Sequence, residues 1–138
     1  MNGFLGQMLD ISKGEDMQTI STDKAPKAIG PYSQGMIVNG IAYLSGQIGV
    51  DPIDGRAAEG IEAQADQACR NVGELLKEAG SDFSKVIRTT CFLADIADFA
   101  AFNAVYEKYF VSKPARSCVA VKDLPAGMLC EIEATAEV

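Results

Sequence analysis

The most constraining feature of the sequence is helical periodicity in a chain that otherwise has strand character. From Gly60 to Ala79 the apolar side chains recur every three or four residues, which indicates one face of an α-helix, and Gly80 follows where a helix commonly ends. Aromatic and aliphatic residues recur in the same way after Asp95, and Pro114 closes this second segment. Two amphipathic helices need an apolar surface to pack on, and a sheet can supply it.

Six segments have the composition of β-strands and surround the two helical ones. Asn39-Gly40 separates Ser33–Val38 from Ile41–Ser45 and favours the type I′ turn of a hairpin. The other predicted strands are Gln18–Ser21, Lys85–Ala94, Ala115–Lys122 and Leu129–Val138. The order β-β-β-α-β-α-β-β predicts an α+β fold with both helices on one face of the sheet. The opposite face must be polar, or be covered by another copy of the chain.

Length and composition predict one domain. The chain has 138 residues, 48% of them hydrophobic, which suits a single core. We expect residues 18–138 to form this domain and residues 1–17 to be a flexible extension, although Met17 could equally be the natural start of the folded part. Neither a membrane span nor a secretory signal is predicted, and the location expected is cytoplasmic. The four scattered cysteines are therefore expected to be reduced thiols, with a disulfide as the alternative.

The absence of histidine limits the chemistry that the chain can perform. Histidine is the usual general base near neutral pH and the commonest metal ligand, and this sequence contains none. Histidine-dependent triads and histidine-bound metals are thus excluded, and a catalytic role must fall to carboxylates, Arg, Lys, Tyr, Cys or backbone groups. The net charge of -7 also argues against a nucleic-acid partner, because phosphate binding requires clustered Lys and Arg.

Strand alternation groups several polar side chains. Arg116 and Cys118 point to one side of their predicted strand, and apolar neighbours such as Val119 point to the other. Glu131 and Glu133 share one face of the last strand. If the apolar sets face the helices, then Arg116, Cys118 and Glu131 all project onto the uncovered face, where a partner subunit could close a pocket over them.

These residue types suit the binding and hydrolysis of a small acid, although other interpretations remain open. The guanidinium of Arg116 has parallel N–H groups that match a carboxylate, and Glu131 could position or deprotonate a water molecule. The pattern alone favours the simpler interpretation, in which Arg116 and the two glutamates are the solvated side of a strand pair. Cys118 could be a nucleophile, but a thiol without a neighbouring histidine is more often a small buried hydrophobe.

Three further positions are candidates on weaker grounds. Tyr32 combines an aromatic ring with a hydroxyl group in a loop, and could either line a site or anchor the loop to the core. Asn103 lies among apolar residues of the second helix, where a structural network is as good an explanation as a ligand contact. Ser45 and Gly46 could expose backbone N–H groups to an anion because glycine permits close approach.

Several separate motifs together resemble the RidA family of reactive intermediate deaminases, also called YjgF or L-PSP. They extend in the family's order from about Gln18 to Val138, and such a set is more specific than any single motif. The matching stretches are Ala28-Ile29-Gly30-Pro31-Tyr32-Ser33-Gln34-Gly35, Ser45-Gly46-Gln47-Ile48, Asn71-Val72, Phe102-Asn103-Ala104-Val105-Tyr106, Pro114-Ala115-Arg116-Ser117-Cys118-Val119 and Glu131-Ile132-Glu133-Ala134.

The resemblance implies a chorismate-mutase-like α+β fold, assembled as a homotrimer with active sites between adjacent subunits. It implies hydrolysis of short 2-enamino or 2-imino acids, such as 2-aminoacrylate, 2-iminopropanoate and 2-iminobutanoate, to a 2-keto acid and ammonia, without a metal or organic cofactor. Arg116 would bind the substrate carboxylate and Glu131 would hold the attacking water. The residues implied to line the cleft are Tyr32, Ser45, Gly46, Asn103 and Cys118, the last largely through its backbone.

The resemblance also carries alternatives, because members of the family have been described as endoribonucleases that inhibit translation and as holdases. The negative charge and the missing histidines weigh against the nuclease. A holdase would need exposed apolar surface, which a sequence does not reveal.

Overall fold

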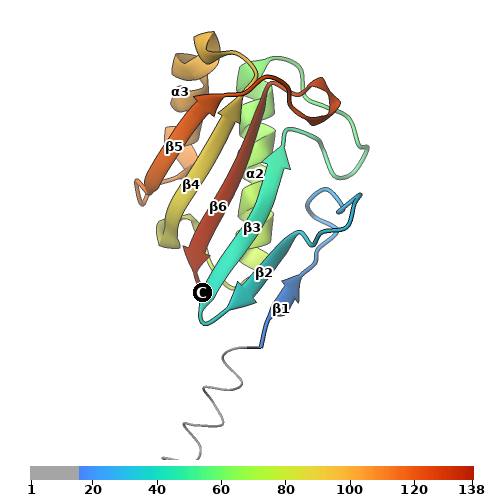
Figure 1. Cartoon of the computed structure of the whole chain (residues 1–138), viewed down its shortest axis with the longest axis vertical. Coiled ribbons are helices and arrows are strands. Elements are labelled where there is room, and N and C mark those ends of the chain that lie inside the picture. The colour runs from blue at the N-terminus through green and yellow to red at the C-terminus, as the bar shows by residue number, and fades with distance from the viewer. Residues whose placement is uncertain (1–15) are drawn as a thin grey trace, which may run out of the picture.

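The computed structural model describes residues 16–138, which form a six-stranded sheet with two helices against one of its faces (Figure 1). The order along the sheet is β1-β2-β3-β6-β4-β5, and all neighbouring strands are antiparallel except β4 and β5. This arrangement confirms the predicted element order and the placement of both helices on one face. The elements are β1 (Gln18–Ile20), β2 (Gly35–Val38), β3 (Ile41–Ile48), α2 (Ile61–Glu78), β4 (Val86–Leu93), α3 (Phe99–Tyr109), β5 (Ala115–Ala120) and β6 (Cys130–Glu137).

Helix α2 forms where the helical periodicity predicts it and supplies one half of the core. Gly60 before it and Gly80 after it both have positive φ angles, 85° and 81°, which favour glycine at these ends. The apolar stripe packs on the sheet and leaves little of its surface to solvent. Side chains of this stripe with no exposed surface are Ala65, Ala68, Cys69, Val72, Leu75 and Leu76.

Helix α3 begins later than the sequence suggests. The predicted start, Asp95, instead caps a short 3-10 turn, Ile96–Asp98, and its carboxylate accepts a hydrogen bond of 2.9 Å from Ala97 N–H. The α-helix proper begins at Phe99. A capping carboxylate is expected at the first turn of either kind of helix, which is why the sequence does not distinguish them.

The predicted hairpin is confirmed, but its second strand is longer than expected. Asn39 and Gly40 both have positive φ angles, 51° and 77°, as a type I′ turn requires. Strand β3 continues past the predicted end at Ser45 because a bulge between Leu44 and Gln47 shifts its register against β6 and then lets pairing resume. The bulge contains Ser45 and Gly46, two of the candidate site residues.

A buried amide on α2 holds the segment that follows β3. The side chain of Asn71 is 1% exposed, and its Nδ2 donates to the carbonyl oxygens of Ile48 at 3.0 Å and Val50 at 2.9 Å. Between these carbonyls, Gly49 lies so close to the backbone of Gln64 that a β-carbon at position 49 would collide with it. The end of β3 is therefore fixed against the helix by contacts that tolerate little change.

The predicted domain begins at residue 18. Strand β1 begins at Gln18, the first residue of the expected domain. Most of the predicted extension, residues 1–17, lies outside the described residues. Within residues 16–138, neither helix combines the length and apolar character that crossing a bilayer would demand.

We predict that Asn71→Ala lowers the free energy of unfolding by roughly 2–3 kcal/mol, because two buried carbonyl groups lose their donor. Urea denaturation of the variant and the wild type measures the difference. Gln67→Ala is the control, since Gln67 only donates to Asn71 Oδ1 from the helix surface and its loss should cost about 1 kcal/mol or less. Equal costs for the two variants would contradict this account of the loop.

Candidate functional site

Arg116 lies near the start of β5 and its guanidinium is held by α3. Its Nη1 donates a hydrogen bond of 2.8 Å to Oδ1 of Asn103, and the guanidinium carbon is 4.7 Å from the centre of the Tyr106 ring. These residues line a depression of about 700 Å³ that also contains Lys113. The arrangement fixes the plane of the guanidinium before any ligand arrives.

Two aromatic residues contribute to this arrangement although the sequence did not single them out. Phe99, Asn103 and Tyr106 are spaced by four and three residues, so they share one face of α3, and the Phe99 ring centre is 5.6 Å from the guanidinium carbon of Arg116. The Tyr106 hydroxyl is in turn 2.6 Å from the Thr89 hydroxyl in the core. Helical spacing around Asn103 was the signal that could have identified both rings.

Cys118 lies two residues beyond Arg116 on the same face of β5. It is the register partner of Cys91 on β4, which has no exposed surface. Burial raises the pKa of the Cys118 thiol, and the nearby charge of Arg116 opposes this only in part. The thiol is therefore poorly ionised at neutral pH, which favours a lining role over a nucleophilic one.

A second group of candidate residues surrounds the bulge in β3. Glu131 on β6 lies beside Gly46, so close that any β-carbon at position 46 would collide with its carboxylate. Ser45 donates a hydrogen bond of 2.6 Å from its hydroxyl to the carbonyl oxygen of Ser33. Glycine is required here by the approach of a charged side chain, and the bulge exists to make that approach possible.

Tyr32 joins this second group in a cleft of about 760 Å³. Its side chain is 52% exposed, and the cleft is lined by Tyr32, Ser45, Gly46 and Glu131 together with apolar residues such as Ile48. The structure thus brings four of the seven predicted site residues into one cleft. Tyr32 does not anchor its loop by burial in the core, which was the alternative that the sequence left open.

The carboxyl group of Glu131 is electrostatically perturbed. Burial raises its pKa first of all, and the negative charge of Glu133 on the same face raises it further. The folded state therefore disfavours ionisation of Glu131. A carboxylate with a raised pKa is a stronger base than an ordinary one, which suits it to accept a proton from water.

The prediction that Arg116, Cys118 and Glu131 share the uncovered face is wrong for Arg116 and Cys118. Cys91 faces the helices and is paired with Cys118 on one side and with Ile132 on the other, so Cys118 and Arg116 also face the helix side. Glu131 is one residue from Ile132 and points to the opposite face. On β5 the apolar alternation misleads, because Val119 is 46% exposed while Arg116 lies against α3.

The seven candidate residues therefore form two groups on opposite faces of the sheet. The Arg116 group consists of Asn103, Arg116 and Cys118, and the Glu131 group consists of Tyr32, Ser45, Gly46 and Glu131. Because Arg116 and Glu131 point to opposite faces, the sheet itself separates them within one chain. In residues 16–138, cysteine, aspartate and glutamate nowhere gather into a group of three that could hold a metal ion.

Comparison with known proteins identifies the family. Residues 22–138 match the family described as Endoribonuclease L-PSP. The chain belongs to this family. The RidA-type resemblance seen in the motifs is thereby confirmed.

Individual relatives agree with this assignment. A human protein named 2-iminobutanoate/2-iminopropanoate deaminase is 51% identical over 86% of this chain and 88% of its own length. A Lactococcus lactis protein named as a regulator, AldR, is 53% identical over 88% of this chain and 98% of its own. The crystal structure of E. coli TdcF with bound serine is 38% identical, covers 88% of this chain and 98% of that one, and has a TM-score of 0.84. The expected α+β fold of the family is confirmed.

We predict that Glu133→Gln lowers the pKa of Glu131, because removal of a neighbouring negative charge favours the ionised carboxylate. NMR titration of the Glu131 side-chain carboxyl carbon measures the change. Glu137→Gln is the control: it removes the same charge from the same strand, but four residues farther along, and should shift the titration much less. A Glu131 titration that is the same in all three proteins would show that Glu133 does not act on it.

Proposed function

We propose that this protein hydrolyses short 2-imino and 2-enamino acids, such as 2-iminopropanoate and 2-iminobutanoate, to a 2-keto acid and ammonia. The observation that carries the proposal is the pre-oriented guanidinium of Arg116. The guanidinium has five N–H donors, and Asn103 accepts a hydrogen bond from one of them. The rings of α3 fix the guanidinium plane, so parallel donors remain for a carboxylate. The human relative named as a deaminase of such acids supports the same substrate class.

The two groups of residues divide the reaction between them. Arg116 binds the substrate carboxylate and so fixes the position of the adjacent imine carbon. Glu131 accepts a proton from a water molecule as that water adds to the carbon, and it passes this proton on to the imine nitrogen, which leaves Glu131 ionised again. The hydroxyl proton of the resulting carbinolamine then passes through Glu131 to the nitrogen, the carbon–nitrogen bond breaks, and ammonia leaves as the keto group forms.

We place the complete site between two copies of the chain. A short imino acid cannot reach through a sheet, yet Arg116 and Glu131 lie on its opposite faces. Rotational packing of identical chains can bring the Arg116 group of one copy to the Glu131 group of the next. The family resemblance favours a closed homotrimer, in which each of the three interfaces would hold one site.

The chemistry needs neither a metal nor an organic cofactor. An imine carbon is already electrophilic, so orientation, a water molecule and one proton acceptor suffice. All four cysteines are free thiols in the structure, which supports a reducing compartment such as the cytoplasm.

The family's description as an endoribonuclease leads to a less favoured alternative. RNA binding rests on clustered positive charge, while this chain has a net charge of -7 and no histidine for acid–base hydrolysis. The Glu131 cleft contains Glu131, Glu133 and Asp51 against the single lysine Lys27, which would repel a phosphate backbone.

We predict that Arg116→Lys is almost as damaging as Arg116→Ala, each lowering kcat/KM on the order of 10²-fold. Lysine keeps the charge but has no planar fork, and it cannot reproduce both the Asn103 hydrogen bond and a paired contact with a carboxylate. An assay that generates 2-iminopropanoate in situ from a dehydratase and follows its disappearance measures the effect. Glu131→Gln should be equally severe, since an amide is a very weak base.

Cys118→Ser is the matched control for these variants. It lies on the same face of β5 two residues from Arg116, and serine preserves its backbone and approximate size. Its kcat/KM should stay within about threefold of the wild type. Loss of turnover in Cys118→Ser together with retention in Arg116→Lys would replace the carboxylate clamp with covalent catalysis by the thiol.

A mixing experiment tests the shared site directly. Arg116→Ala and Glu131→Gln chains are each expected to be nearly inactive alone. When they are unfolded and refolded together in equal amounts, every mixed trimer contains one interface with both native residues, so about a quarter of wild-type activity should return. No recovery, with mixed assembly verified by mass spectrometry of differently tagged chains, would contradict a site between subunits.

A further inference from the structure

A buried glutamine fastens the loop that carries Tyr32. The side chain of Gln34, the residue immediately before β2, is 6% exposed although it is polar. Its Oε1 accepts a hydrogen bond of 2.7 Å from Thr22 N–H, and its Nε2 lies 3.0, 3.2 and 2.8 Å from the carbonyl oxygens of Thr22, Ala25 and Pro26. One amide therefore holds the backbone of residues 22–26 by both of its ends.

The same residue also joins this loop to the bulge of β3. The backbone carbonyl of Gln34 accepts a hydrogen bond of 2.9 Å from Ser45 N–H, and the Ser45 hydroxyl donates to the carbonyl of Ser33. We name residues 21–33 the Tyr32 loop. Its first part is held by the Gln34 side chain, and its last residue is held by the bulge that places Gly46 beside Glu131.

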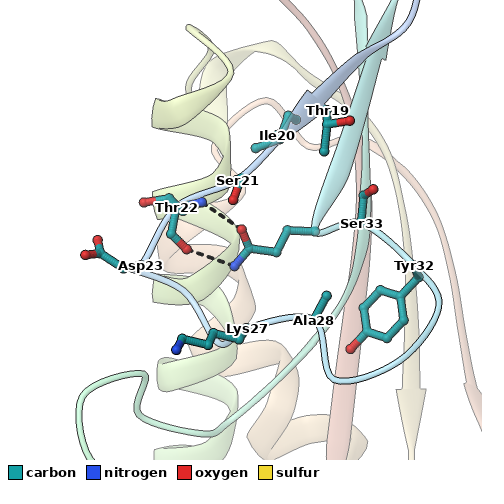
Figure 2. Close-up of a pocket in the computed structure, with 10 residues that line it drawn as sticks. Thr19, Ile20, Ser21, Thr22, Asp23, Lys27, Ala28, Tyr32 and Ser33 are labelled. Carbon is teal, nitrogen blue, oxygen red and sulfur yellow. Dashed lines mark hydrogen bonds between the residues drawn. The ribbon is translucent and has the colours of Figure 1, made fainter.

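Between these two attachments the loop turns sharply and presents Tyr32. Tyr32 N–H donates to Gly30 at 2.8 Å, and the Tyr32 ring packs so near Gly30 that a β-carbon there would be 3.3 Å away. Figure 2 shows a pocket between this loop and β1, with Thr22 and its hydrogen bonds on one side and Tyr32 on the other. The pocket has a volume of about 410 Å³. Gln34 and Tyr32 both line this pocket and the Glu131 cleft.

We infer that Gln34 is a positioning residue for the deamination reaction, which holds the loop in the conformation that directs Tyr32 into the Glu131 cleft. This inference rests on the proposed function and adds a role that acts only through Tyr32. The Tyr32 loop buries few side chains of its own, Ala25 being one that is 1% exposed, so hydrogen bonds to Gln34 replace apolar burial in ordering it.

Removal of the Gln34 amide should change the populations of the conformations of the Tyr32 loop. Without the amide, the loop would sample conformations in which Tyr32 lies outside the cleft, and apparent affinity falls by the fraction of chains that remain competent. Substrate binding would still select the competent loop, so KM should rise while kcat stays nearly constant. A defect that distorted Glu131 itself would instead lower kcat.

The test is a double-mutant cycle between Gln34→Met and Tyr32→Ala in the full-length chain. Methionine fills nearly the same volume as glutamine but makes no such hydrogen bonds. We expect Gln34→Met to raise KM for 2-iminopropanoate about tenfold with kcat within about twofold. The double variant should have a kcat/KM within about twofold of Tyr32→Ala alone, because the loop then has no tyrosine to position.

The chain offers a matched control in Gln64→Met. Gln64 is also 6% exposed, and its amide likewise accepts from a backbone N–H, that of Leu129 at 2.8 Å, and donates to a carbonyl, that of Ala58 at 3.0 Å. It belongs to α2 and has no contact with the Tyr32 loop among these bonds. The double variant of Gln64→Met and Tyr32→Ala should lose kcat/KM by the product of the two single-variant factors.

Hydrogen exchange provides a readout that does not depend on turnover. In Gln34→Met the Thr22 amide should exchange about tenfold faster, while the Ser45 amide, which binds the backbone carbonyl of residue 34, should keep its wild-type rate. Multiplicative effects of Gln34→Met and Tyr32→Ala, an unchanged KM, or a Tyr32→Ala variant with wild-type kcat/KM would each overturn the inference. A wild-type protein without turnover would refute the proposed function, and unchanged exchange at Thr22 would refute the anchoring itself.

Discussion

The pleat of the central strands determines where every functional group of this protein can lie. Side chains alternate across a strand, and two helices cover only one face of the sheet, so each residue of β5 and β6 is committed to one side. Arg116 falls on the side of α3, and Glu131 falls on the other side. The division between the Arg116 group and the Glu131 group thus follows from strand register, and it is the reason that the proposed reaction requires a second chain.

The Arg116 group and the Glu131 group are held in place by different structural features. On the helix side, α3 presents Phe99, Asn103 and Tyr106 along one face, which orients a guanidinium without burying its charge completely. On the open side, a β-bulge and a glycine bring backbone next to the Glu131 carboxylate, where partial burial and Glu133 raise its pKa. Neither arrangement uses all the hydrogen-bonding atoms of the Arg116 guanidinium or the Glu131 carboxylate, so both groups remain available to a ligand.

The sequence was informative where local chemistry decides structure. The end of α2 just before Gly80, the Asn39-Gly40 turn and the order of elements follow from periodicity and turn preference, and all were predicted. The face of β5 could not be predicted in this way. It is an edge strand covered by one aromatic-rich helix, so polar Arg116 lies under α3 while Val119 is half-exposed, and apolar alternation gives the wrong side. Likewise, the role of Gln34 depends on hydrogen bonds to residues about ten positions away, which no local pattern encodes.

Amides, rather than ions, hold the segments around the Glu131 group and the end of β3. Among the described residues the buried polar side chains are four amides, Gln34, Gln47, Gln64 and Asn71, and one hydroxyl, Thr89. Each amide forms hydrogen bonds with backbone groups of a turn or bulge. These bonds satisfy carbonyl groups that have no partner within a strand or helix. An amide side chain does not titrate, so its hydrogen bonds do not change with pH. A carboxylate or lysine in the same place would couple loop structure to proton concentration through its own titration. Because the framework does not titrate, the proton transfers proposed for Glu131 would leave the shape of the surrounding cleft unchanged.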